Sequence, residues 1–169
     1  MFDNNTASEY IRLMKVQLVT DQESLKEAKT IAYGIYEGEI PVEANELSKI
    51  YLKENPKFGK PYEIQLLYTE KQSYLLVGLG KKDKFDFSAC QNFAGTVVKS
   101  LFFKTKEAII IPPESDNLIF EEEIYAMAIG AELASHDPGQ IYKSESEPAQ
   151  LISLQIFLNK VRGEEKNAF

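Results

Sequence analysis

Apolar and polar positions alternate along the chain in two periods, which divide it into strands and helices. Period-two alternation or a short apolar run predicts a strand, whereas apolar residues three and four positions apart predict a helix. The predicted strands are 16–20, 31–36, 63–69, 73–79, 108–111 and 151–158, and the predicted helices are 45–53, 88–101 and 118–135, with a short helix or loop over 21–29. This succession is typical of an α/β protein with a mixed sheet.

Two of these elements carry further local signals. Only three polar residues separate strands 63–69 and 73–79, so the two are predicted to pair as an antiparallel hairpin. In helix 88–101, Ser88 is followed three residues later by Gln91, which is the pattern of a capping box. We therefore expect this helix to begin at Ser88.

Length and composition favour one domain without membrane or disulfide chemistry. A chain of 169 residues with 44% hydrophobic residues can bury one core. The expected organisation is an arm or extension over 1–13, a domain over 14–158 and a polar tail over 159–169. No stretch approaches the ~18 apolar residues of a membrane span, and the first residues do not have the pattern of a secretory signal. The single cysteine, Cys90, suits a reducing compartment, so we expect a cytoplasmic protein.

The glycines after strand 73–79 are the first candidate for chemistry. A dinucleotide fingerprint would need glycine where Asp83 stands, and a phosphate-binding P-loop would need Ser or Thr at Lys82. Gly78 and Gly80 are therefore predicted to form a structural turn. A site for an anion at these glycines, with Lys81 and Lys82, is the less favoured alternative.

The remaining reactive residue types have structural explanations. His136 ends a predicted helix and is expected to stabilise its last carbonyls. Cys90 lies on the apolar stripe of its helix, as a core cysteine does. Glu121–Glu123 occupy consecutive helix positions ~100° apart, so they cannot converge on one metal ion and are expected to be a solvated start of the helix. No catalytic, cofactor-binding or metal-binding residue is predicted.

A basic patch for nucleic acid is weakly supported. Its candidates are Lys84, Lys99, Lys104 and Lys106, next to two phenylalanines. The net charge of −7 would repel a phosphate backbone. Nucleic acid is therefore an unfavoured partner.

Ordered motifs along the chain resemble a known family. The segment LLVGLGKKDKFD at 75–86 is followed by CQNFAGTVVKSL at 90–101 and AIIIPP at 108–113. A second landmark, AIGAELASHDPGQIYKSE at 128–145, follows at the expected distance. Together these motifs resemble the N-terminal domain of the leucyl (cytosol) aminopeptidase family.

The resemblance implies a fold and a role. The implied fold is a macro-domain-like three-layer sandwich, with a mixed sheet between helices on both faces. The implied parent is a cytoplasmic, hexameric metallopeptidase that uses zinc or manganese to release N-terminal residues such as leucine. Its metal ligands lie in a larger C-terminal domain, and none of those motifs occurs in this sequence.

We therefore expect a non-catalytic accessory domain that serves assembly or regulation. Its expected partners are the catalytic domain of the parent and other copies in a homo-oligomer. Two alternatives stay open. One is a macro-like module that binds ADP-ribose or a related nucleotide, and the other is a DNA-binding accessory domain.

Overall fold

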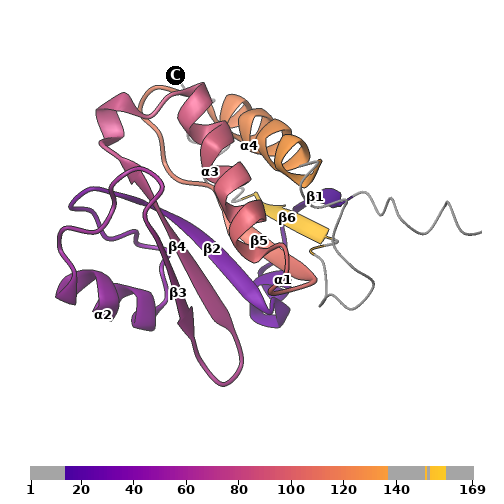
Figure 1. Ribbon diagram of the computed structural model, residues 1–169, viewed down its shortest axis with the longest axis horizontal. Coiled ribbons are helices and arrows are strands. Elements are labelled where there is room, and N and C mark those ends of the chain that lie inside the picture. The colour runs from indigo at the N-terminus through magenta and orange to yellow at the C-terminus, as the bar shows by residue number, and fades with distance from the viewer. Residues whose placement is uncertain (1–13, 137–150, 152, 159–169) are drawn as a thin grey trace, which may run out of the picture.

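A six-stranded mixed sheet forms the centre of the molecule (Figure 1). The computed structural model describes residues 14–136, 151 and 153–158, so the predicted arm and tail lie outside the described residues. The strands are β1 (Lys15–Val19), β2 (Thr30–Tyr36), β3 (Ile64–Tyr68), β4 (Ser73–Gly80), β5 (Glu107–Ile111) and β6 (Ser153–Phe157). The helices are α1 (Gln22–Glu27), α2 (Glu46–Glu54), α3 (Phe87–Leu101) and α4 (Phe120–Ser135), with a 3₁₀ turn over Lys82–Lys84.

The strand order is β1-β6-β5-β2-β4-β3. β3 and β4 pair antiparallel, with Leu66 opposite Leu75, which confirms the predicted hairpin. All other neighbouring strands are parallel. Parallel neighbours need crossover connections, and here the helices supply them.

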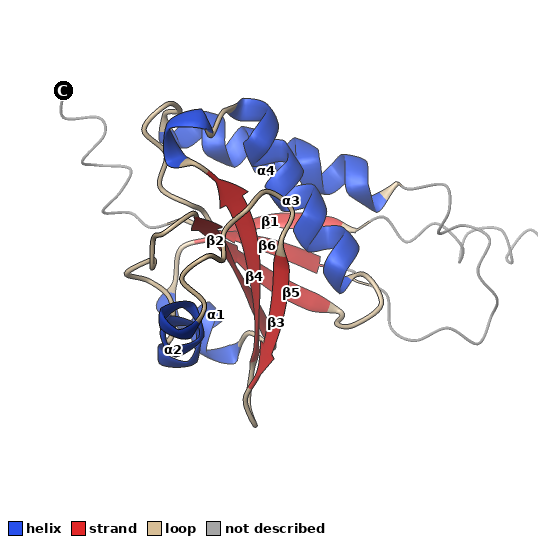
Figure 2. Cartoon of the chain, turned by 60° about the vertical axis from the view of Figure 1, so that its left-hand side comes forward, coloured by secondary structure: helices blue, strands red, loops and turns tan. Residues whose placement is uncertain are grey.

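Helices cover both faces of the sheet, as Figure 2 shows. α3 and α4 pack on one face, where Val77 and Ile110 belong to the larger core cluster. α1 and α2 lie on the other face, where Tyr33, Leu52 and Leu76 form a smaller cluster. Because successive strand residues point to opposite faces, the continuous apolar runs of the central strands supply both clusters. The predicted three-layer α/β sandwich is therefore confirmed.

The α3–α4 pair is closely packed because glycines lie at the crossing. A Cβ on Gly130 would overlap the backbone carbonyl of Gln91, and Gly95 lies against the backbone of Gly130. None of the helices in the described part of the chain is long and apolar enough to cross a membrane.

The predicted start of α3 is wrong in detail. α3 begins at Phe87, and the Asp86 carboxylate caps it by accepting the Ala89 N–H at 2.8 Å, so Ser88 lies inside the helix. A carboxylate is at least as good a cap as a hydroxyl, and it also complements the helix dipole.

The acidic start of α4 is only partly the solvated run that was expected. The Glu122 carboxylate accepts the N–H of Ile119 at 3.1 Å, which fixes the first turn. Glu123, in contrast, is completely buried. Consecutive helix positions point ~100° apart, so the three glutamates face different directions, and Glu123 is the one on the buried side of α4.

Candidate functional site

The end of β4 is fastened to the loop before β3. The Gly78 N–H donates to the Glu63 carbonyl at 2.7 Å, and the Gly80 N–H donates to the Gly59 carbonyl at 2.7 Å. The Glu63 carboxylate in turn accepts the N–H groups of Gly59 at 3.0 Å and Lys60 at 3.2 Å. This loop therefore lies across the last residues of the strand.

The two glycines of the predicted turn have different structural reasons. Gly78 lies within β4 without a positive φ, and a Cβ there would overlap the backbone carbonyl of Lys60. Gly80 ends the strand with a φ of 80°. The prediction that both glycines reverse the chain is therefore wrong for Gly78, which is required by the close approach of another backbone segment.

A cavity of about 430 Å³ opens beside these glycines, between the end of β4 and the first turns of α3. Asn92 Nδ2 of α3 lies 3.2 Å from the hydroxyl oxygen of Tyr62 and donates to it. Tyr62 holds its place with a φ of 66°, which is uncommon for a residue other than glycine. Polar groups and the aromatic residues Tyr62 and Phe93 thus line the same cavity.

The structure separates the lysines of the predicted anion site. Lys81 and Lys84 line the cavity, and so do the acidic residues Glu37 and Asp86. Lys82 does not line this cavity: its Nζ lies 3.8 Å from Asp116 Oδ1 and 5.9 Å from the centre of the Tyr36 ring. Two lysines and two carboxylates leave this cavity without a clear preference for an anion.

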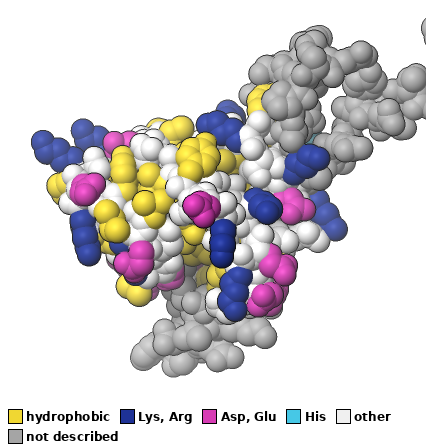
Figure 3. Space-filling model, turned by 90° about the horizontal axis from the view of Figure 1, so that it is seen from below, with side chains coloured by type: hydrophobic (Ala, Val, Ile, Leu, Met, Phe, Trp, Pro, Cys, Tyr) yellow, Lys and Arg dark blue, Asp and Glu magenta, His cyan; other side chains and the backbone are white. Residues whose placement is uncertain are grey.

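The predicted basic patch is also dispersed. Lys84 precedes α3, whereas Lys104 and Lys106 follow its end, and a helix of this length spans ~22 Å. Lys99 lines a separate groove between α3 and α4. On the face drawn in Figure 3, Lys side chains stand among Asp and Glu side chains. DNA binding itself stays an untested prediction.

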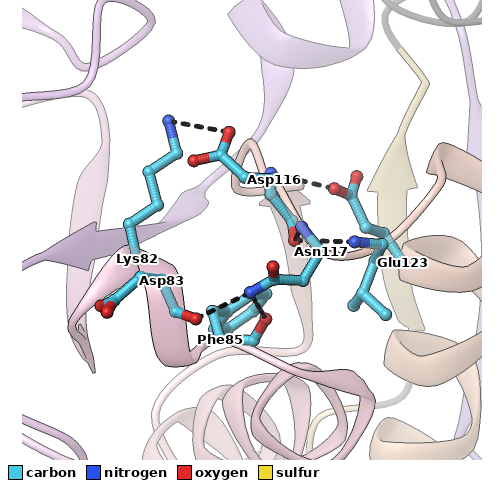
Figure 4. Close-up of polar contacts among 8 residues, drawn as sticks. Lys82, Asp83, Phe85, Asp116, Asn117 and Glu123 are labelled. Carbon is cyan, nitrogen blue, oxygen red and sulfur yellow. Dashed lines mark hydrogen bonds and ion pairs between the residues drawn. The ribbon is translucent and has the colours of Figure 1, made fainter.

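A polar network joins the loops that follow β4 and β5 (Figure 4). Asn117 Nδ2 donates to the carbonyl oxygens of Asp83 at 3.0 Å and Phe85 at 3.1 Å. Glu123 Oε1 accepts the N–H of Ser115 at 3.1 Å. The buried carboxylate and the amide therefore hold both loops in place. The sequence pattern predicted a solvated Glu123 and did not indicate Asn117.

The residue types usually associated with catalysis are held in structural contacts. Burial, together with the nearby Glu123, raises the pKa of the Cys90 thiol to about 12, so this thiol is protonated at neutral pH. His136 is the C-cap residue of α4: its backbone N–H donates to the Leu133 carbonyl at 3.4 Å, and its ring Nε2 lies 3.0 Å from Glu132 Oε1. Among the residues that the structure describes, no three His, Cys, Asp or Glu side chains come together as metal ligands would.

A smaller hollow of about 140 Å³ lies at the carboxyl ends of β2 and β5. Ligands of open α/β sheets often bind in this position. Its walls include the side chains of Glu39, Glu43 and Glu114 and the prolines after β5, and Lys82 is directed toward Asp116. Its size is below the ~300 Å³ of ordinary ligand pockets.

Some residues of the larger cavity were not predicted. Ser88, Asn92 and Thr96 line it at four-residue spacing along α3, a pattern that is visible in the sequence as a polar stripe. Tyr62 carries no comparable signal, because its position depends on a left-handed backbone in the loop before β3.

The sheet order, the helices on both faces and the cavity at the strand ends define a macro-domain-like α/β protein. The macrodomain of Thermus aquaticus DarG has this fold: its TM-score is 0.54 at 6% identity, with 85% of this chain and 98% of that chain covered. A mutant of tomato leucine aminopeptidase has a TM-score of 0.62 at 16% identity, over 91% of this chain and 35% of that chain. The bottromycin maturation enzyme BotP in complex with Mn has a TM-score of 0.56 at 15% identity, over 83% of this chain and 29% of that chain.

Comparison of the sequence with known families identifies the family of this chain. Residues 20–146 match the N-terminal domain of the cytosol aminopeptidase family. A probable cytosol aminopeptidase of Acidobacterium capsulatum is 30% identical over 146 residues, which is 85% of this chain and 25% of that protein. This chain therefore belongs to the cytosol aminopeptidase family and corresponds to its N-terminal domain, as its motifs indicated. It spans about a quarter of the length of that relative.

Proposed function

We propose that this chain is a non-catalytic accessory domain of a cytoplasmic two-metal leucyl aminopeptidase and serves its assembly or regulation. The observation that carries the proposal is the family match over residues 20–146, in a chain that spans 25% of its relative. The reaction of the parent, removal of N-terminal residues such as leucine from peptides, is assigned to the rest of that protein.

The donor groups of this chain support a non-catalytic role. In two-metal hydrolysis, the metal ions activate water and stabilise the developing oxyanion, and they need several converging ligands. The described residues offer no such group, and the buried carboxylate of Glu123 is already bonded to the loop after β5. We therefore assign zinc or manganese to the catalytic domain of the parent.

The expected partners are that catalytic domain and further copies in a homohexamer. Large apolar side chains on and just before α4 are available for such contacts: Ile119 is 58% exposed, Tyr125 64% and Leu133 68%. Exposed apolar groups of this size are stabilised when a partner covers them.

An activity assay tests the proposal. The purified 169-residue chain should not hydrolyse leucyl amide substrates when zinc or manganese is added, whereas the Acidobacterium relative serves as the positive control. Turnover that co-purifies with the chain and survives metal-affinity and size-exclusion steps would show that a catalytic site is present here. Addition of the catalytic domain should produce a complex in sedimentation velocity.

Nucleotide binding is the second candidate, favoured by the cavity of about 430 Å³ beside Gly78 and Gly80. Calorimetry with ADP-ribose distinguishes it from the accessory role, because a micromolar dissociation constant would support the nucleotide-binding module. A gel shift at low salt tests DNA binding in the same way. If DNA bound, the affinity would fall steeply with salt.

A further inference from the structure

The outer edge of β3 is open for pairing with another strand. β3 is the last strand of the sheet, and within the described residues its only strand neighbour is β4. Its sequence, IQLLY, contains no charged residue and no proline between Glu63 and Glu70. Natural edge strands are usually protected by such residues, as β1 is at the opposite edge by Lys15.

The hydrogen bonds to β4 show which backbone groups are available. Thr69 N–H donates to the Gln72 carbonyl at one end, and Gly78 N–H donates to the Glu63 carbonyl at the other. Hydrogen-bonded residues alternate along an antiparallel ladder, so positions 63, 65, 67 and 69 face β4. The N–H and C=O groups of Ile64, Leu66 and Tyr68 therefore point away from the sheet. The outward carbonyl of Leu66 accepts Gln65 Nε2 at 3.0 Å, a side-chain contact that a pairing strand would replace.

The side chains at these same three positions form an apolar row. Tyr68 is 70% exposed and Ile64 is 47% exposed, while Leu66 lies between them, partly buried against the core of the α3 face. Each residue whose backbone groups point outward thus also offers an apolar side chain.

We propose that β3 pairs with β3 of a second copy of this chain across a two-fold axis at Leu66. In this register Leu66 of one copy lies opposite Leu66 of the other, and Ile64 lies opposite Tyr68 of the other copy. Each hydrogen-bonded pair therefore uses only backbone groups that point away from β4. The apolar rows of the two copies meet on one face, and the two sheets join into one.

The flanking charges agree with this register. Glu70 falls opposite Tyr62 of the other copy and one diagonal step from Lys60, and Glu63 falls opposite Thr69. No like charges therefore lie opposite each other, which would oppose pairing. The contact closes at two copies, because each chain uses its single β3 edge.

This inference deepens the assembly role proposed above: the biological purpose of the β3 pairing rests on that proposed function. The pairing is tested with the 169-residue chain alone, whereas the accessory role is tested by activity and with the catalytic domain. The two can therefore fail separately.

Sedimentation equilibrium measures the pairing directly. A two-strand contact is small beside the ~1,600 Å² of a stable interface, so the mass should rise from 19.2 kDa toward twice that value between about 10 µM and 1 mM. Ile64→Lys or Tyr68→Lys should raise the dissociation constant about tenfold or more. The control Leu18→Lys, at the exposed position of the other edge strand, should leave it unchanged. Thermal unfolding verifies that every variant is folded.

A cysteine at the two-fold axis tests the register. Hydrogen-bonded antiparallel residues have Cα atoms about 5.5 Å apart, which a disulfide can bridge. Leu66→Cys should form a covalent dimer under mild oxidation, and Leu18→Cys should not; native Cys90 is buried and does not interfere. A monomer at 1 mM, equal cross-linking of both variants, or assemblies larger than two would overturn the proposal.

Discussion

Gly78 lies in a strand without a positive φ, yet a Cβ at this position would overlap the carbonyl oxygen of Lys60. At the residue scale, the shape of the cavity thus depends on how closely two backbone segments approach. Between α3 and α4, the buried thiol of Cys90 lies 3.4 Å from the backbone carbonyl of Glu123.

Gly78→Ala should lower the free energy of unfolding by about 2 kcal/mol or more, because the loop over 59–62 has to move. Gly38→Ala is the matched control: that glycine has a φ of 76° with nothing within 4 Å of a Cβ, so only backbone strain of about 1 kcal/mol is expected. Urea unfolding of both variants measures the difference. Equal costs would contradict the close approach at Gly78.

Cys90 should make the protein less stable at alkaline pH. Burial raises its pKa from 9.0 to about 12, so the folded state holds the proton more tightly than the unfolded state. The contribution is fully present below pH 9 and is lost as the pH rises toward 12. Between pH 8 and pH 10, the wild-type chain should lose about 1 kcal/mol more than Cys90→Ala, as measured by denaturant unfolding at both pH values. Parallel losses in the two proteins would show that Cys90 is not the titrating group.

At the scale of elements, the caps and crossings of α3 and α4 hold the site in place. Asp86 caps α3 at the wall of the larger cavity, and Asn117 connects the loop after β5 to the start of the same helix. Gly130 allows the two helices to approach closely. The position of the cavity therefore depends on contacts between elements that are distant in the sequence.

Asp86→Ala should cost about 1 kcal/mol of stability, because it removes the acceptor for the Ala89 N–H. Ser88 is the residue that the sequence pattern predicted as the cap. Ser88→Ala should lower the stability by only a few tenths of the loss expected for Asp86→Ala. Thermal unfolding of the two variants decides which residue is the cap. If Ser88→Ala lowered the stability more than Asp86→Ala, Ser88 would be the cap, as the sequence pattern predicted.

At the scale of the whole molecule, β6, the last strand of the described residues, lies inside the sheet. β6 pairs with both β1 and β5, so the first and last strands depend on each other. The family match ends at residue 146, before β6 begins. The folded sheet therefore extends beyond the matched segment at both ends.

A chain that stops at residue 150 should lose cooperative unfolding, because β1 and β5 would both lose their shared neighbour. Ile156→Ala gives a graded comparison: this side chain is fully buried, and its truncation should cost about 2–4 kcal/mol while a sharp transition remains. Circular dichroism during heating measures both. A sharp transition in the shortened chain would mean that β6 is not needed for the sheet.

The sequence predicted most of the elements but only part of the site. The strands, the hairpin and the helices follow from local periodicity, and their bounds differ from the prediction by a few residues. The cap at Asp86 was missed because Ser88 offered a competing pattern nearby. The positions of Tyr62 and Asn117 could not be predicted, because each depends on a contact with a segment about thirty residues away.

The sequence by itself determined the α/β class, the antiparallel hairpin and, through its ordered motifs, the family. Local periodicity and turn chemistry act over a few residues, and these features need no more than that. Only the tertiary structure decided that Lys82 turns toward Asp116, that Glu123 is buried and that β3 is an edge strand of the described sheet. These outcomes depend on which distant segments become neighbours, because burial and the direction of a free backbone group are set by packing across the whole sheet.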